Sequence, residues 1–158
     1  MGFKEFGSPA DMRYAGEFIT SGAGVKLVVG VDTGVFDGYV NCGAAGTITG
    51  IGNVLPKEVL TLSNLSRAAA SGDADARILG DELDRAMKVL ASFDEGPDLV
   101  LYYKHLLVVK GDDAYRLHFN DTDALSPSQK DYAEQQLRLF ATWYATWSQQ
   151  PGLSGYLA

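Results

Sequence analysis

Lys4 is the residue whose type and position best fit covalent chemistry. It lies in the segment Gly2-Phe3-Lys4-Glu5, shortly before Phe6, a glycine and the start signal of a helix. If residues 2–4 end a buried strand, the Lys4 ammonium projects from the rim of a sheet, where loss of water disfavours its charged form. Such a lysine can act as an amine nucleophile toward a carbonyl. Taken alone, the local sequence favours a solvated lysine, because chain ends are usually disordered unless they are tied down.

Two further segments resemble strand ends that lead into loops. They are residues 30–33, which include Asp32, and the glycine-rich residues 48–53. Parallel α/β folds bind ligands at the carboxyl ends of their strands, so these two segments and Lys4 form the candidate site. The glycines of the second segment could also admit an anion such as phosphate at the next helix N-terminus. Asp32 fits an acid, a group that orients a neighbour by hydrogen bonding, or the N-cap of the next helix, and the sequence favours the cap.

The other reactive side chains favour structural roles. His105 and His118 have no partner at metal-ligand spacing, so both are interpreted as structural histidines, and we expect neither a metal nor another cofactor. Cys42 is the only cysteine and lies in an apolar stretch, which predicts a core position. No serine lies in the sequence context of a nucleophile elbow.

Composition and charge limit the classes of partner. The chain has 158 residues, of which 46% are hydrophobic and 21% charged, as in a globular domain. Its net charge is −7 and its basic residues are scattered, which argues against nucleic acid and anionic membranes as partners. The sequence shows no basic-plus-apolar leader and no apolar run near the ~18 residues that span a bilayer. We therefore expect a cytoplasmic protein.

Strand and helix signals alternate over the first 71 residues. Ser8 and Pro9, with Asp11 three residues after the serine, predict a helix that ends at residues 21–24. Together with a strand near Lys4, the alternation at this spacing indicates a parallel α/β sheet. The further predicted elements are a strand over 25–30 buried on both faces, a short helix over 35–43, a strand over 46–50 and a helix over 56–71.

Beyond residue 71 the pattern is helical. The spacing predicts helices over 74–93, 99–109 and 126–147, although the period of the second fits a strand as well. A capping signature at Ser126 begins the last helix. That helix carries an apolar stripe that favours a core or oligomer contact over a cofactor site, formed by Leu137, Phe140, Tyr144 and Trp147. Residues 111–125 are predicted to be a loop, and residues from 149 onward a loose tail.

The order of these features resembles the second half of the dihydrodipicolinate synthase / N-acetylneuraminate lyase family. The resemblance covers most of residues 1–93. It rests on three segments, Gly2-Phe3-Lys4-Glu5, Gly30-Val31-Asp32 and GAAGTITGIGNVLP at 43–56. It implies the C-terminal half of a (β/α)8 TIM barrel, with strands six to eight, followed by a helical region. The implied organisation is a partial barrel over 1–71, helices over 72–150 and a tail over 151–158.

The resemblance also implies a chemistry. Lys4 matches the family's lysine that forms a Schiff base with a 2-oxo acid. Gly30, Asp32, Thr33 and Ile48 match positions that line the substrate site, Ile48 mainly through its backbone. The stretch from 94 to 124 is more similar to the branch of 2-keto-3-deoxy sugar-acid dehydratases. The implied substrate is therefore a 2-oxo acid, either of the pyruvate type or a 2-keto-3-deoxy sugar acid.

The family's first five strands have no counterpart in this sequence. Those strands carry its tyrosine proton shuttle, its paired hydroxyls and its carboxylate-binding turn. Three strands cannot close a barrel, and an open sheet leaves an unpaired edge and apolar surface. We therefore expect a fragment that is inactive alone and needs the missing N-terminal half-barrel or a homo-oligomer partner. The alternative is a non-catalytic structural or assembly fragment that needs a partner chain and whose lysine never becomes nucleophilic.

Overall fold

The computed structural model describes residues 1–20 and 24–158, and it contains a three-stranded parallel sheet. The strands are β1 (Gly2–Glu5), β2 (Lys26–Val29) and β3 (Gly46–Thr47), in the order β1-β2-β3. Lys4 lies opposite Val28 in the register. The predicted parallel α/β sheet is thus confirmed, but β3 is shorter than the predicted strand over 46–50.

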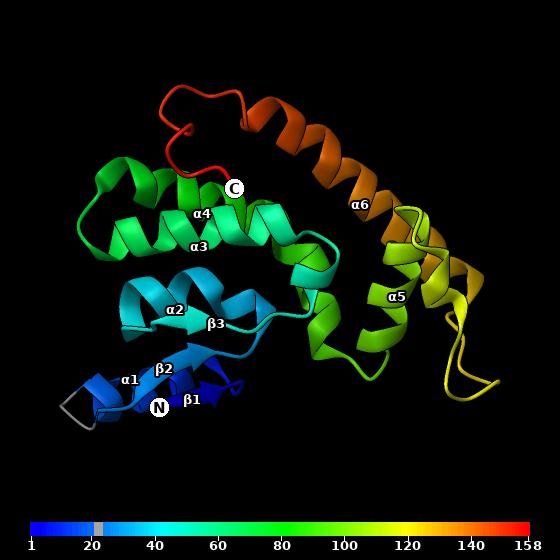
Figure 1. Cartoon of the computed structure of the whole chain (residues 1–158), viewed down its shortest axis with the longest axis horizontal. Coiled ribbons are helices and arrows are strands. Elements are labelled where there is room, and N and C mark those ends of the chain that lie inside the picture. The colour runs from blue at the N-terminus through cyan, green and yellow to red at the C-terminus, as the bar shows by residue number, and fades with distance from the viewer. Residues whose placement is uncertain (21–23) are drawn as a thin grey trace.

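Helices α1 (Pro9–Thr20) and α2 (Val35–Cys42) pack on one face of the sheet (Figure 1). A Cβ atom on Gly38 would lie 2.3 Å from Val29 Cγ2 and 2.9 Å from Met12 Sδ, so glycine lets α2 approach the strand closely. Cys42 is buried in this layer, as predicted. Gly24 has a φ of +64°, and the other predicted helix-end residues, 21–23, lie outside the described part of the chain.

The opposite face of the sheet is open. In β2, Leu27 and Val29 are buried against the helices, whereas Lys26 is exposed and Val28 only half-buried. The prediction that residues 25–30 are buried on both faces is therefore wrong for this chain. Side chains alternate between the two faces of a strand, and within the described residues helices cover only one of them.

Two antiparallel helices, α3 (Pro56–Ala70) and α4 (Ala74–Ala91), form the next layer (Figure 1). They are joined by a tight turn in which Gly72 has a φ of +99°. The Asp73 carboxylate then accepts a 2.9 Å hydrogen bond from the backbone N–H of Ala76 and caps α4. Both helices were predicted from the apolar spacing.

Helices α5 (Leu99–Val109) and α6 (Pro127–Trp147) complete the chain's helical part. The ambiguous segment 99–109 is helical, and Ser126 forms a capping box with Gln129 at the start of α6. Three members of the predicted stripe are buried, which supports its core interpretation: Leu137, Phe140 and Trp147. The loop over 111–125 is confirmed, except for a 3-10 turn at Asp113–Arg116.

The C-terminal segment is not a loose tail, and that prediction is wrong. Leu153 is fully buried, and the Tyr156 hydroxyl donates a 2.6 Å hydrogen bond to the Asp73 carboxylate. The amide nitrogen of Asn64, on α3, donates to the backbone oxygen of Tyr156 at 3.1 Å. The segment lies over α3 and α4, as Figure 1 shows in red, and its burial depends on contacts far away in sequence.

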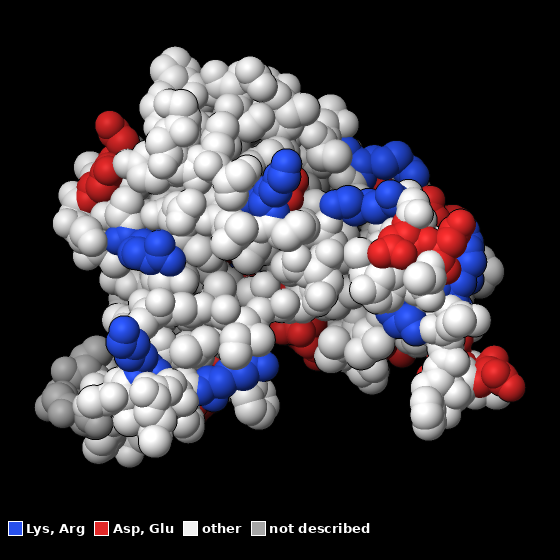
Figure 2. Space-filling view, in the orientation of Figure 1, with Lys and Arg blue, Asp and Glu red and all other residues white. Residues whose placement is uncertain are grey.

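Lys and Arg side chains are spread over the face shown in Figure 2 rather than gathered in one basic patch. Toward α5 and α6 they alternate with acidic residues. Across the described residues, no helix combines the length and apolar character that a bilayer span needs.

Candidate active site

The side chain of Lys4 lies directly across Gly30. A Cβ atom on Gly30 would lie 2.4 Å from Cε of Lys4 and 2.7 Å from its Cγ. The Gly30 N–H donates a 2.7 Å hydrogen bond to the backbone oxygen of Glu5, which holds the end of β2 against β1. Glycine at position 30 is therefore the residue that lets the Lys4 side chain extend over the neighbouring strand.

Lys4 is exposed in this chain, as are Gly2 and Phe3 before it in β1. The solvated lysine that the local sequence favours is thus what the structure shows, and the condition for a desolvated Lys4, a buried strand, is not met within these 158 residues. The reason is geometric: β1 is an edge strand, and Lys4 shares the open face of the sheet with Val28, its partner in the register.

A cleft of about 1030 Å³ opens beside Lys4 where β1 and β2 end. Gly30 and Thr33 line the same cleft. The Thr33 hydroxyl donates a 2.6 Å hydrogen bond to Oε1 of Glu95, and Lys88 on α4 donates to the Thr33 backbone oxygen at 3.2 Å. The structure therefore brings three of the predicted site residues, Lys4, Gly30 and Thr33, to one cavity whose rim includes cations, carboxylates and a hydroxyl.

Asp32 is buried, with an exposed fraction of 3%, and its carboxylate connects distant segments. Its Oδ1 accepts a hydrogen bond from the N–H of Gly50 at 2.8 Å, and its Oδ2 accepts one from the N–H of Ile51 at 2.6 Å. The hydroxyl of Tyr103, on α5, donates a third bond to Oδ2 at 2.9 Å. Burial raises the pKa of Asp32, and these three donors act in the opposite direction by stabilising the carboxylate.

These hydrogen bonds bear on two interpretations from the sequence: that Asp32 caps the next helix, and that the glycine-rich residues 48–53 admit an anion. Asp32 does not cap the helix that follows it, because Gly34 precedes α2 without a side-chain cap and Asp32 itself begins a 3-10 turn, Asp32–Gly34. It acts instead as the group that orients a neighbouring loop. The N–H groups of Gly50 and Ile51, which the phosphate alternative needs for an anion, already bind the Asp32 carboxylate.

Tyr103 is a residue of this network that the sequence analysis did not single out for a role. Its ring lies against Gly50, where a Cβ atom would come within 2.4 Å of Cε2. Burial and the neighbouring Asp32 carboxylate raise the pKa of the Tyr103 hydroxyl, so it stays protonated and donates. Its apolar neighbours on α5 at helical spacing indicate a buried face, but its polar partner is 71 positions away.

Ile48, the remaining predicted site residue, lies just beyond β3. Its side chain is 57% exposed, and its backbone N–H donates a 2.8 Å hydrogen bond to the backbone oxygen of Val29. Ile48 does not line the cleft that contains Lys4 in the described part of the chain. The structure thus separates Asp32 and Ile48 from the Lys4 cleft.

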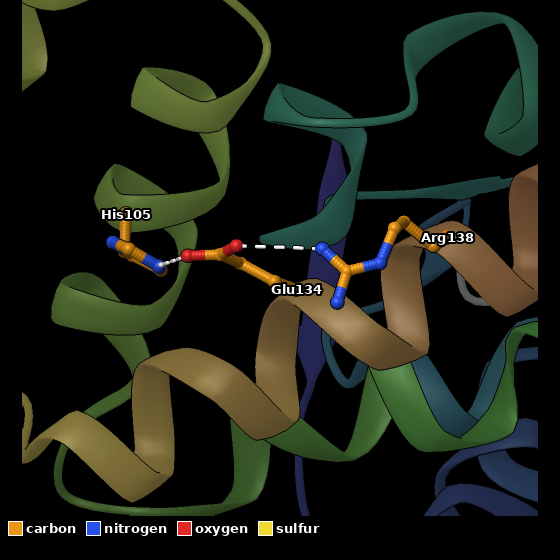
Figure 3. A network of polar contacts seen from close by, with 3 residues as sticks. All are labelled: His105, Glu134 and Arg138. Atoms are coloured by element: carbon orange, nitrogen blue, oxygen red, sulfur yellow. Dashed lines mark hydrogen bonds and ion pairs between the residues drawn. The ribbon is translucent and has the colours of Figure 1, made fainter.

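Of the two polar contacts drawn in Figure 3, the one between His105 and Glu134 joins α5 to α6, and the other lies within α6. His105 lies 3.1 Å from Oε1 of Glu134 through its Nε2 atom, and Arg138 contacts the other oxygen of that carboxylate at 3.4 Å. His105 therefore has the structural role that was predicted for it. His118 lies in the exposed loop, and residues 1–20 and 24–158 contain no group of three or more potential metal ligands.

The site is thus a lysine at the carboxyl end of a parallel strand in an α/β fold. No family model and no curated protein matches this sequence. Among solved structures, the fold matches the 4-hydroxy-tetrahydrodipicolinate synthase from the thermoacidophilic methanotroph Methylacidiphilum fumariolicum SolV. The TM-score is 0.73 at 19% sequence identity, and the match covers 100% of this chain and 48% of the synthase chain.

This match concerns the fold. At this identity it shows that the chain folds like part of a dihydrodipicolinate synthase, as the sequence resemblance implied. The chain spans about half the length of that enzyme.

Proposed function

We propose that these 158 residues form the C-terminal half of a Schiff-base lyase or dehydratase acting on a 2-oxo acid. The observation that carries this proposal is the position of Lys4, at the carboxyl end of β1 and in one cleft with Thr33. Active sites of (β/α)8 enzymes lie at that end of the strands. The synthase-like fold supports the assignment of β1, β2 and β3 to barrel strands six, seven and eight.

In this mechanism the Lys4 amine attacks the keto carbon of the substrate. Loss of the keto oxygen as water leaves an iminium ion, which withdraws electrons from the adjacent carbon. An α-proton, a carbon–carbon bond or a β-hydroxyl group can then be lost, and water finally hydrolyses the imine and frees Lys4. The proton donor and acceptor for these steps come from the half of the barrel outside this chain, so the chain alone does not complete the reaction, whereas imine formation requires only the amine of Lys4.

The other predicted residues have different parts in this proposal. Gly30 lets the Lys4 side chain extend, and Thr33 offers its hydroxyl to the substrate from the same cleft. Ile48 has a backbone role only by the family resemblance, since it does not line the cleft and its N–H bonds to the backbone oxygen of Val29. Asp32 acts indirectly, because its carboxylate is buried and holds the loop after β3 by the N–H groups of Gly50 and Ile51.

Borohydride trapping tests the proposal. The folded chain is incubated with pyruvate or a 2-keto-3-deoxy sugar acid and then reduced, and mass spectrometry measures the adduct on each lysine. We expect the adduct on Lys4 to exceed that on Lys26 and Lys57, which are also exposed. An even distribution over the lysines, or no adduct on Lys4, contradicts the proposal. The Lys4→Arg variant serves as the blank.

The exposure of Lys4 favours a second candidate function. In a non-catalytic structural or assembly fragment, the lysine remains a solvated side chain and the open face of the sheet serves only to bind a partner chain. This candidate predicts the even distribution of adducts, so the same experiment separates the two.

A further inference from the structure

A cavity of about 280 Å³ lies where the loop over 111–125 meets helices α5 and α6. It shares no described residue with the cleft of the candidate active site. Both histidines of the chain line it, His105 from α5 and His118 from the loop. Arg116 in the loop and Lys130 near the start of α6 line it as well. Four side chains that can carry positive charge therefore converge on one cavity, in a chain whose net charge is −7.

Each of these four side chains keeps hydrogen-bonding capacity that no described residue uses. The side chains of His118 and Lys130 form no hydrogen bond or ion pair within the described part of the chain. His105 contacts the carboxylate on α6 only through Nε2, which leaves its Nδ1 available. Arg116 bonds Asp113 through Nε and one terminal nitrogen, both at 2.8 Å, whereas a guanidinium has five N–H donors. The cavity can therefore offer several donors to a ligand.

The carboxylates near the cavity already have partners. Asp123 is the acidic residue among the described lining residues, and it accepts a 3.1 Å hydrogen bond from Nδ2 of Asn120. Lys104, the neighbour of His105 on α5, donates instead to the backbone oxygen of Leu117. The charged groups that line the cavity or bond to its lining residues are Asp113, Arg116, Asp123, Lys130, Glu134 and, through Glu134, Arg138. The cations and carboxylates of this set balance, so protonation of either histidine makes the cavity positive.

The chemistry of these groups defines the kind of ligand. Protonated imidazole, guanidinium and ammonium groups are donors without an acceptor, so together they fit an oxyanion. A metal ion fits less well, because the described residues contain no group of three or more potential metal ligands. A purely structural cluster would pair its cations with carboxylates, whereas Lys130 has no such partner in the described part of the chain. The volume lies just below the range typical of drug-sized ligands, which indicates a small molecule.

We propose that this cavity binds a dianionic oxyanion group such as phosphate, either free or as the end group of a small metabolite. Arg116 and Lys130 supply permanent positive charge, and His105 and His118 add charge and donors when they are protonated. Histidine changes its charge between pH 5 and 8, so binding is stronger at the acidic end of that range. The ligand bridges the loop to α5 and α6. This inference goes beyond the proposed function and does not depend on Lys4.

Nuclear magnetic resonance tests the site, because the two histidines of the chain give two Cε1–H signals. The folded chain is titrated with sulfate, whose charge is constant in this range, at about pH 5.5 and about pH 8, with chloride holding the ionic strength constant. We expect both signals to shift saturably at the lower pH and the dissociation constant to be several-fold higher at the higher pH. The absence of saturable shifts would overturn the inference.

A parallel titration with glycerol 3-phosphate distinguishes the two sources of the oxyanion group. Tighter binding than sulfate assigns the end group of a metabolite, because the rest of the molecule then contacts the cavity. Equal or weaker binding assigns a free oxyanion.

Lys130→Gln should weaken sulfate binding at the lower pH by about fivefold, the upper end for an exposed charge pair. The matched control is Lys57→Gln, because Lys57 is also an exposed lysine near the start of a helix that begins with proline. It should leave binding unchanged. His118→Gln should remove much of the pH dependence, and it assigns the two signals. The three side chains are exposed, so circular dichroism should show an unchanged fold. Equal weakening by the two lysine variants, or a pH dependence that His118→Gln leaves intact, would overturn the inference.

Discussion

The hydroxyl of Tyr103 donates a 2.9 Å hydrogen bond to the carboxylate of Asp32, 71 positions earlier in the chain. This buried bond connects α5 with the loop after β2. Because the same carboxylate also binds the N–H groups of Gly50 and Ile51, the loops after β2 and β3 and the helical part of the chain are held at one point.

Removing the Tyr103 hydroxyl should destabilise the fold. In Tyr103→Phe the Asp32 carboxylate remains buried with one donor fewer, so the free energy of unfolding should fall by about 1–3 kcal/mol. Urea denaturation followed by circular dichroism measures the change. The control Tyr115→Phe removes a hydroxyl from an exposed ring and should change the stability by less than about 0.5 kcal/mol. Equal stability of the two variants would show that the Tyr103 bond contributes nothing.

Gly30→Ala should move the Lys4 side chain. The new methyl group would lie 2.4 Å from Lys4 Cε and 2.9 Å from the Glu5 backbone oxygen, so the lysine must leave its place over β2. Borohydride trapping with pyruvate should then give several-fold less adduct on Lys4. Gly46→Ala is the control, because no described atom lies within 4 Å of the added carbon. An undiminished adduct in Gly30→Ala would mean that the position over Gly30 is irrelevant to reactivity.

The buried C-terminal segment makes a measurable contribution to stability. Leu153→Ala should lower the free energy of unfolding by about 2–5 kcal/mol, since Leu153 is fully buried and its removal leaves a cavity. Leu157→Ala, at a side chain that is 40% exposed, should cost much less. Thermal and urea unfolding compare the two. If both variants matched the wild type, the segment would not be packed in solution.

Asp84 should make the stability depend on pH. Burial raises its pKa from 3.8 to about 6 in the folded protein, although Lys88 and the Phe36 N–H partly counteract this. A raised carboxyl pKa means that the folded state binds the proton more tightly, so this contribution to stability falls as the pH rises from about 4 to about 6. Asp84→Asn should therefore be more stable than the wild type at pH 7.5, by up to about 3 kcal/mol, and nearly equal at pH 4.

Urea unfolding across this pH range measures the difference between variant and wild type. The control is Asp131→Asn on the exposed side of α6, which should show no such trend. A difference for Asp84→Asn that stays constant from pH 4 to 7.5 would contradict the raised pKa.

Several features of the candidate site were accessible from the sequence. The loop that begins at Gly30 follows from an apolar run bounded by glycines, whereas the strand end at Lys4 was indicated by the family resemblance. The role of Asp32 was not accessible, because a carboxylate before a short helix is usually its cap. Its partners at Gly50, Ile51 and Tyr103 become neighbours only when β2, β3 and α5 are packed together.

The sequence by itself determined the local elements. Ser8 with Asp11, and Ser126 with Gln129, form the predicted capping interactions, because each depends on residues three positions apart. Apolar periodicity likewise predicted the helices of the second half and the parallel strands of the first. These features are set by hydrogen bonds and side-chain spacing within a few residues.

Only the tertiary structure decided which surfaces are buried. It places Leu153 in the core although its segment has no regular pattern, and it leaves Lys4 and the second face of β2 exposed although their sequence is typical of a barrel strand. The physical reason is that burial depends on what packs against a residue from elsewhere in the chain. Here α3 and α4 cover the C-terminal segment, while no described element covers the open face of the sheet.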